Sequence, residues 1–165
     1  MAKKPYPILI LLVLLVTGPL YGQDFTILNE IGELDGDLSE VFGFVKDAAF
    51  TEEGRILVLD SRMLELRLFD SLGVFISSTG RSGKGPGEFT IPVAMIAVPG
   101  GAAVLDRGNS RITYFAVSES LTLEIDHEIP LQFHAWDMCI ASGRVFLASD
   151  NWAAPVVEID QSGQV

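Results

Sequence analysis

The sequence has 165 residues, of which 48% are hydrophobic and 20% charged, a composition typical of a folded domain rather than a disordered segment. The formal net charge of −11 excludes the basic surface that a nucleic-acid-binding protein needs, so no nucleic-acid partner is expected. The only cysteine, Cys139, excludes an internal disulfide, and its apolar surroundings predict a packing role rather than a reactive one.

Residues 1–22 have the pattern of a secretory signal peptide. Lys3 and Lys4 precede an apolar run over 8–16, and a break at 17–19 leads to the small residue Gly22. As a helix this run would cover about 14 Å, against roughly 30 Å of hydrocarbon in a bilayer. We therefore expect cleavage to leave an exported chain, periplasmic or extracellular, with no stable membrane span. An uncleaved anchor is the alternative.

The rest of the chain, 23–165, repeats one pattern of glycine, apolar run and aspartate. The pattern occurs in "GRILVLDS", "GAAVLDRGNSRI" and "GRVFLASDN", whose aspartates are Asp60, Asp106 and Asp150. Their spacing of about 45 residues is typical of propellers and solenoids. Apolar and polar residues alternate with a period of two at 64–68 and 121–125, which predicts half-buried strands.

Short strands separated by turn signals, with no helical stripe after the leader, predict an all-β fold. Continuous apolar runs at 56–59 and 145–148 predict inner strands that are covered on both faces. Four short antiparallel strands in each repeat are typical of a β-propeller blade. The fold class is therefore expected to be a β-propeller of four-stranded antiparallel blades, with about three blades in this sequence.

The blades are expected at about 47–79, 94–129 and 137–165, and the last of these ends before its fourth strand. A strand at 25–31, followed by Gly32 and a loop to Phe42, is similar to the strand before Gly80 and the loop to Phe89. It is expected to complete the last blade of a closed ring. These features predict the N-terminal part of a longer propeller, and a half-propeller that closes by dimerising is the alternative.

One segment resembles a known family. The run "GRSGKGPGEF" at 80–89 is similar to the inter-blade segment of NHL-repeat propellers, and Asp106, Asn109 and Arg111 match their Asp-x-x-Asn-x-Arg pattern. The first repeat departs from the pattern, with Met63 and Glu65 in place of the asparagine and arginine. The resemblance covers about 25–165 and implies a six-bladed, exported bacterial propeller. It implies little about activity.

Two segments that look like ligand motifs have simpler interpretations. In the glycine-rich run 80–89, Gly85 follows Lys84 where a phosphate loop needs a serine or threonine, so a tight loop with glycines at positive φ is expected. The acidic run 35–39 resembles a calcium loop, but Lys46 stands at the twelfth position in place of a bidentate glutamate. It is expected to be a solvated acidic loop.

Candidate ligand-binding residues lie in the loops at one end of the expected blades. The recurring aspartates either surround a ligand or accept hydrogen bonds from the turn amides of their own blades. The residues beside them differ between repeats, and variation on a repeated frame is where specificity resides. The candidate set is Asp47, Asp60, Arg62, Asp106, Arg107, Asn109, His134, Asp137, Asn151 and Trp152, with no catalytic and no metal-binding residue assigned.

Two functions follow from this set. The first is an exported binding module for a protein, peptide or glycan ligand, without a cofactor. The second is an exported hydrolase or lyase with Ca²⁺ or Zn²⁺ in the central channel, which the family resemblance allows. Only His134, Asp47 and Asp137 could supply inward-facing metal ligands, so the sequence favours binding over catalysis.

Overall fold

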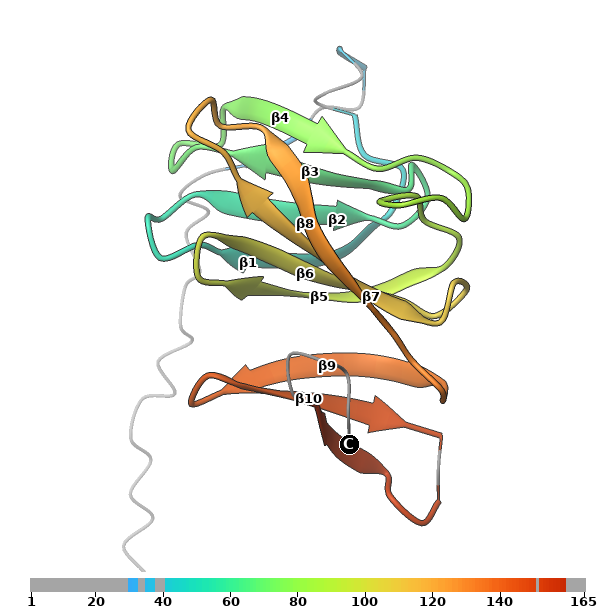
Figure 1. Ribbon diagram of the computed structural model, residues 1–165. Helices are drawn as coiled ribbons and strands as arrows, with labels where there is room; N and C mark the ends of the chain where they lie inside the picture. The colour runs from blue at the N-terminus through green and yellow to red at the C-terminus, as the bar shows by residue number, and fades with distance from the viewer. Residues whose placement is uncertain (1–29, 33–34, 38–40, 151, 160–165) are drawn as a thin grey trace, which may run out of the picture.

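The computed structural model describes residues 30–32, 35–37, 41–150 and 152–159. This part of the chain forms eleven strands in three antiparallel sheets and contains no helix (Figure 1). The prediction of an all-β fold built from propeller-like blades is confirmed. The expected signal peptide at 1–22, and the expected strand at 25–31 up to residue 29, lie outside the described residues. Within the described part, no helix is long and apolar enough to cross a membrane.

Each sheet is built from strands that follow one another along the chain. The first sheet has the order β1 (Val45–Phe50), β2 (Ile56–Asp60), β3 (Glu65–Phe69) and β4 (Phe75–Thr79). The second has the order β5 (Pro92–Val98), β6 (Gly101–Asp106), β7 (Arg111–Val117) and β8 (Leu123–Pro130). The third consists of β9 (Ala135–Ala141), β10 (Arg144–Ser149) and β11 (Val156–Ile159), with β10 in the middle.

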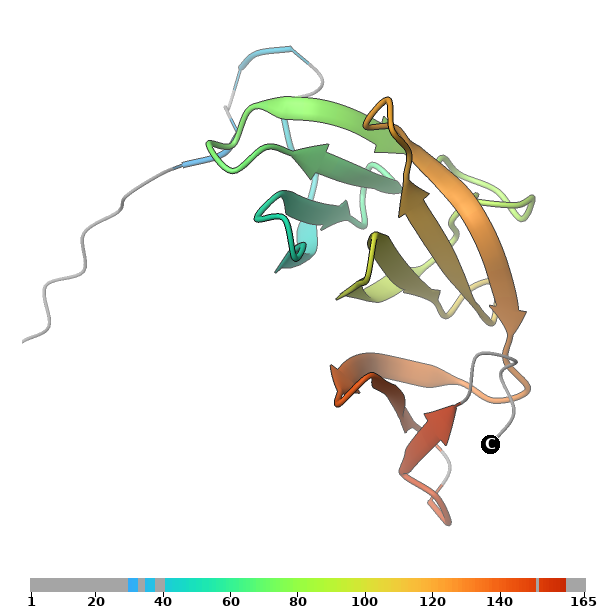
Figure 2. The ribbon, with the colours of Figure 1, turned by 60° about the vertical axis from the view of Figure 1, so that its left-hand side comes forward.

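The first strands of the three sheets, β1, β5 and β9, lie next to one another, and the later strands of each sheet extend outward (Figure 2). Apolar side chains fill the two spaces between neighbouring sheets. One cluster, which includes Leu57, Leu66, Phe89 and Phe115, joins the first sheet to the second. Another, which includes Ile112, Met138 and Leu147, joins the second to the third. The stack of sheets is therefore held together by burial of apolar surface.

The apolar run at 56–59 is covered as the sequence predicts, but the run at 145–148 is not. Residues 57–59 are buried in β2, whereas in β10 only Leu147 is. The prediction for β10 was wrong because no further sheet covers its other face within the described residues. For the same reason Cys139 on β9 is exposed and does not pack in the core as expected.

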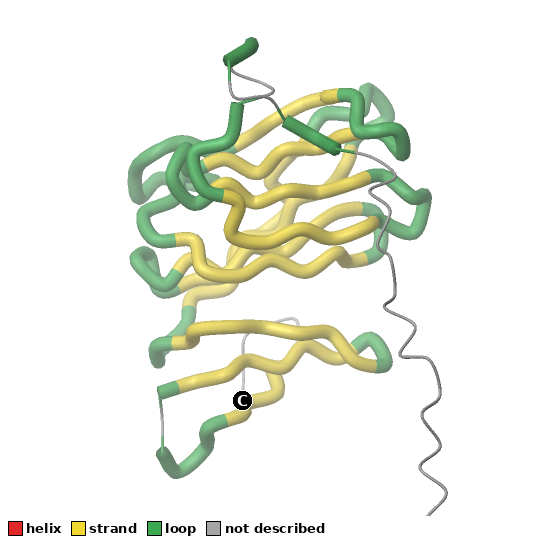
Figure 3. Tube along the Cα trace, turned by 180° about the vertical axis from the view of Figure 1, so that it is seen from behind, coloured by secondary structure: helices red, strands yellow, loops and turns green. Residues whose placement is uncertain are grey.

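The loops gather at the two ends of the strands (Figure 3). We call one of these ends the loop face: it carries the β2–β3, β6–β7 and β10–β11 loops and the chain segments that enter β1, β5 and β9. It lies on the right in Figure 1. The opposite end carries the tight turns between the first and second strands of each sheet, at 51–55, 99–100 and 142–143.

Each first strand contains one unpaired, bulged residue close to the loop face. The pairing of β1 with β2, β5 with β6 and β9 with β10 shifts by one residue, which leaves Lys46, Val93 and Trp136 at equivalent positions. This register also places Ser149 opposite Ala135, as Asp60 lies opposite Val45 and Asp106 opposite Pro92. The prediction that Asp150 is the third member of the aspartate series was therefore wrong by one residue.

Backbone hydrogen bonds confirm this equivalence. The amide of Ser61 donates to the Phe44 carbonyl (3.0 Å) and that of Arg107 to the Ile91 carbonyl (3.0 Å). In the third sheet, the corresponding bond joins the amide of Asp150 to the carbonyl of His134 (3.2 Å). Asp150 thus occupies the position of Ser61 and Arg107, where the side chain is free to leave the turn.

Candidate functional site

The carboxylate of Asp60 holds the turn that follows β2. It is fully buried and accepts four backbone amides, from Gly43 (2.6 Å), Phe44 (3.0 Å), Arg62 (2.9 Å) and Met63 (2.9 Å). Burial opposes ionisation of the carboxyl, but these four donors together outweigh it and hold the pKa of Asp60 below its usual value. Because the group is buried and its four donors belong to the β2–β3 turn and to the segment that enters β1, Asp60 fixes these two segments relative to each other. We call these segments, and their counterparts in the other sheets, the loop frame.

Asp106 has the same role in the second sheet. Its buried carboxylate accepts the amides of Thr90 (2.8 Å), Ile91 (2.8 Å) and Gly108 (3.0 Å), and the side-chain amide of Asn109 (2.8 Å). Of the two roles that the sequence allows for the recurring aspartates, Asp60 and Asp106 therefore have the second: they accept hydrogen bonds from the turn amides of their own sheets.

Asn109 and Arg111 hold the glycine-rich loop 80–89 in place. The Asn109 side chain donates to the carbonyls of Gly83 (3.0 Å) and Glu88 (3.1 Å). The Arg111 guanidinium donates to the Glu88 carbonyl (2.7 Å) and pairs with Glu128 (3.2 Å). The motif that carries the family resemblance thus joins one sheet to the loop that leads into it.

The first sheet achieves the same attachment with a different residue. Arg67, with a side chain only 1% exposed, donates to the Val41 carbonyl (2.8 Å), pairs with Glu65 (3.0 Å) and lies 4.9 Å from the centre of the Phe42 ring. The sequence comparison showed that Glu65 stands where the NHL pattern has an arginine, but it did not show that Arg67 takes over the role of that arginine. An arginine in the middle of an apolar alternation was the available signal.

The turn of the glycine-rich loop 80–89 is held by the carboxylate of one of its own residues. Gly80 and Gly87 have φ values of 103° and 67°, as predicted for a tight loop. The Glu88 carboxylate fills the turn by accepting the Gly85 amide (2.7 Å) and pairing with Arg81 (2.7 Å). The Gly85 amide and then Arg81 lower the pKa of Glu88. The loop is therefore closed by its own anion.

Asp47 and Asp137 occupy equivalent positions on β1 and β9. One oxygen of Asp47 accepts the amide of Ala48 (2.9 Å), and the other accepts the amide of Met95 in the next sheet (2.9 Å). Asp137 likewise accepts the amide of the residue that follows it, Met138 (2.9 Å). Among the described residues, histidine, cysteine, aspartate and glutamate side chains form no group of three or more that could hold a metal ion.

A different set of side chains on the loop face is exposed or half-buried. The Arg107 guanidinium lies 4.7 Å from the ring centre of Trp136, a residue 47% exposed at the bulge of β9. Trp152, in the β10–β11 loop, is 97% exposed. His134 Nδ1 lies 3.5 Å from an oxygen of Asp150. Sequence reasoning selected Arg107, His134 and Trp152 but missed Trp136, because a bulge interrupts the alternation that predicts side-chain direction.

A hollow of about 430 Å³ opens beside the His134–Asp150 pair. Four of its six lining residues are polar, since Ser110 and Gln132 join the His134–Asp150 pair, and the other two are Leu131 and Phe133. Arg62 lies in the β2–β3 turn on the same face, against Gly43. Asn151, the last candidate from the sequence, is outside the described residues. The loop face thus combines exposed aromatic rings, a guanidinium and a polar hollow.

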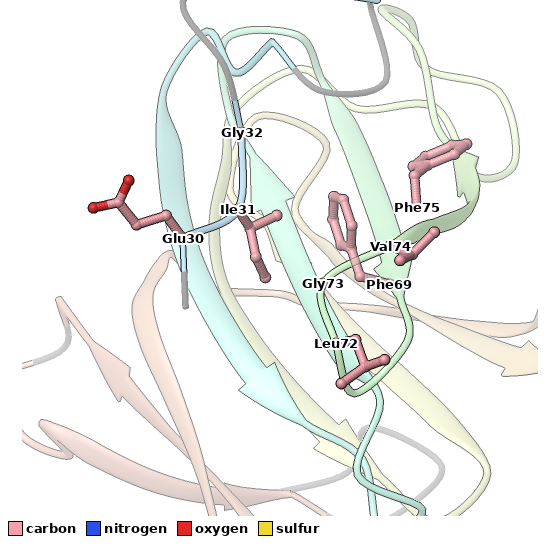
Figure 4. A pocket seen from close by; sticks show the side chains of 8 residues that line it. All are labelled: Glu30, Ile31, Gly32, Phe69, Leu72, Gly73, Val74 and Phe75. Carbon is pink, nitrogen blue, oxygen red and sulfur yellow. The ribbon is translucent and has the colours of Figure 1, made fainter. Parts of the chain in front are cut away.

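A second pocket lies away from the loop face, at the outer edge of the first sheet. It has a volume of about 240 Å³ and lies between residues 30–32 and the β3–β4 hairpin. Figure 4 shows Ile31 pointing toward Phe69 and Glu30 pointing away from the pocket. Since its walls are mainly aliphatic and aromatic, with no converging polar side chains, it is part of the packing between this segment and the sheet.

Known proteins place the chain in a family. A crystal structure from Bacteroides fragilis, of a protein named as exported, matches with a TM-score of 0.65 at 19% identity, over 82% of this chain and 40% of the other. This chain thus spans about two fifths of that structure, and the likeness shows the fold. A search of the curated proteins finds no match. A family model described as a 6-bladed beta-propeller matches residues 41–143. Because this match covers more than half of the sequence, the chain belongs to the DUF5128 family of 6-bladed beta-propellers.

Proposed function

We propose that the protein is an exported binding module whose loop face holds the ligand. The observation that carries this proposal is the contrast between frame and surface. The carboxylates of Asp60 and Asp106 accept turn amides, whereas Trp136 and Trp152 are exposed on the same face and Arg107 lies half-buried against the Trp136 ring. A large exposed aromatic side chain on a rigid loop is a typical binding anchor.

Equivalent positions on the loop face carry different chemistry in each sheet. The residue after the buried aspartate or its serine counterpart is Ser61, Arg107 or Asp150. The bulged residue of the first strand is lysine, valine or tryptophan in the three sheets. A repeated backbone with non-repeated exposed side chains is the arrangement that repeat proteins use for recognition.

Export is supported by the leader-like pattern at 1–22 and by the name of the Bacteroides fragilis relative. The compartment would be the periplasm or the extracellular space. We also keep the NHL-like character as a proposal, because Asp106, Asn109 and Arg111 hold the inter-blade loop together.

The blade boundaries at about 47–79, 94–129 and 137–165 belong to the same proposal, as does the closing strand at 25–31. Two details support that strand. Gly32 and Gly80 have φ values of 106° and 103°. The Phe42–Phe69 and Phe89–Phe115 ring centres are both 6.0 Å apart. These similarities support the proposal that Gly32 and Phe42 correspond to Gly80 and Phe89.

The second hypothesis, a metal-dependent hydrolase or lyase, gains no specific observation. Both oxygens of Asp47 are bound to backbone amides, and Asp137 uses one of its two. Its test is metal analysis of the purified whole protein. A stoichiometric Ca²⁺ or Zn²⁺ content, with ester or lactone turnover lost in His134→Ala, would replace the binding proposal by the enzymatic one.

The proposed function is tested with two matched variants of exposed aromatic residues. Trp152→Ala removes a side chain 97% exposed on the loop face, and Phe50→Ala removes one 71% exposed near the opposite end of β1. Neither substitution opens the core, so both variants should fold. We expect binding of the whole protein to arrays of peptides and glycans to fall at least tenfold in Trp152→Ala only. Equal binding by both variants, or a loss only in Phe50→Ala, would contradict the proposal.

A further inference from the structure

The distribution of ion pairs over the arginines singles out the loop face. In the part of the chain that the structure describes, five arginines pair with a nearby glutamate: Arg55, Arg67, Arg81, Arg111 and Arg144. The other two, Arg62 and Arg107, pair with no carboxylate among the described residues, and both lie on the loop face. In a protein with 22 acidic and 11 basic residues, unpaired arginines at one end require an explanation.

Arg107 is held in position without being neutralised. Its guanidinium lies 4.7 Å from the ring centre of Trp136, and this cation–π contact orients the group while leaving its N–H edge without an acceptor among the described residues. A planar guanidinium with a free edge is suited to bind a carboxylate with two parallel hydrogen bonds. Lys46, at the bulge of β1, adds an exposed positive charge on the same face.

The surroundings of Arg107 fit a sugar ring better than a peptide. Trp136 and Trp152 offer flat, exposed apolar surfaces on which the C–H face of a pyranose can stack. The neighbouring hollow of about 430 Å³ presents the hydroxyl of Ser110, the amide of Gln132 and the His134–Asp150 pair to a ligand rich in hydroxyl groups.

Acidic groups on the same face limit where a carboxylate can bind. Asp150 is partly exposed, and the His134 imidazole lies 3.5 Å from it. Asp137 directs one oxygen to the Met138 amide. The anionic part of a ligand is therefore expected at Arg107, with its hydroxyl groups toward Asp150.

We propose that the loop face binds an acidic oligosaccharide, with Arg107 pairing with the carboxylate of a uronic acid and Trp136 and Trp152 stacking against the sugar rings. This inference rests on the proposed function, since it names the ligand class of the same face. The acceptors of the hollow bind sugar hydroxyls, which gives affinity for neutral sugar units next to the acidic one. Arg107 accounts for the preference for the acid over its uncharged derivatives.

The test compares tri-galacturonic acid with its methyl ester by titration calorimetry on the whole protein. We expect the ester, which lacks the charge, to bind at least tenfold more weakly. Arg107→Gln should weaken binding of the acid to the level of the ester and leave binding of the ester unchanged. Arg107→Lys should keep part of the preference, because it retains the charge but not the two parallel donors.

Arg55→Gln provides the matched control, because it removes the same charge at the opposite end, where Arg55 pairs with Glu53 (3.8 Å). It should bind the acid like the unmodified protein.

Equal affinity for acid and ester, or a preference that survives Arg107→Gln, would overturn the inference while leaving a binding role for the loop face intact. Binding of hexaglutamate in place of the sugar, with the same dependence on Arg107, would overturn the glycan class. Failure of both acidic probes to bind at millimolar concentration would overturn the inference, and the array comparison of Trp152→Ala with Phe50→Ala would then decide the proposed function separately.

Discussion

Replacing Asp106 by asparagine tests the account of the loop frame. The substitution keeps the shape of the side chain and removes its charge. One oxygen of Asp106 accepts the amides of Ile91 (2.8 Å), Gly108 (3.0 Å) and Asn109 (3.4 Å). The other accepts the amide of Thr90 (2.8 Å) and the side-chain nitrogen of Asn109 (2.8 Å). An asparagine can present its oxygen to only one of these two groups of donors.

The expected loss of stability follows from the donors left without an acceptor. If the new amide oxygen faces the group of three, its NH₂ faces two N–H donors in a site with no exposure to water. A hydrogen bond to a charged acceptor contributes about 1.5–3 kcal/mol, so two lost bonds cost about 3–6 kcal/mol. The three bonds that remain also weaken, because their acceptor becomes neutral. We expect the free energy of unfolding to fall by about 4 kcal/mol.

Urea unfolding of the whole protein, followed by far-ultraviolet circular dichroism, measures this loss. Glu119→Gln, a substitution of an exposed acid in the β7–β8 turn, is the matched control and should change the free energy of unfolding by less than about 0.5 kcal/mol. A loss below about 1 kcal/mol in Asp106→Asn would refute the reasoning. It would mean that the buried carboxylate is not what holds the loop frame.

Three further predictions concern other parts of the frame. Arg111→Lys should cost about 2 kcal/mol and speed proteolysis within loop 80–89, because lysine cannot replace the several N–H donors of the guanidinium; unchanged cleavage would contradict this. The lowered pKa of Asp60 adds stability that is complete above the pKa of the unfolded state and is lost as pH falls through the pKa of the folded state. Acidification from about pH 5 to about pH 2 should therefore lower the free energy of unfolding of the native protein more than that of the Asp60→Asn variant. Gly101→Ala should cost more than about 2 kcal/mol, since its Cβ would overlap a backbone carbonyl of β7, whereas Gly143→Ala, at φ 74° in open space, should cost about 1 kcal/mol.

Much of the frame could be predicted from the sequence because its signals are local. The pattern of glycine, apolar run and aspartate marks β2 and β6 directly, and the aspartates hold turns within their own sheets. The positive φ values of Gly80 and Gly87 follow equally from a tight loop. Each of these features depends on residues close together in the chain or on a repeated period.

The features that the sequence did not reveal depend on strand register. Asp150 was aligned with Asp60 and Asp106, but the pairing of β10 with β9 places Ser149, opposite Ala135, in that position. A one-residue shift of this kind changes which side chain enters the turn and which remains on the surface. Trp136, the bulged residue of β9, lies next to Arg107 of the second sheet, and no local pattern encodes this contact between sheets.

The most direct test of the central claim is to map ligand protection by amide hydrogen exchange on the whole protein, with and without a saturating glycan identified on the array. The account predicts slower exchange at 61–64, 107–110, 131–136 and 152–155, segments of the loop face. It also predicts no change in the turns at 51–55, 99–100 and 142–143 on the opposite end. Protection confined to those opposite turns would contradict the assignment of the loop face as the binding surface.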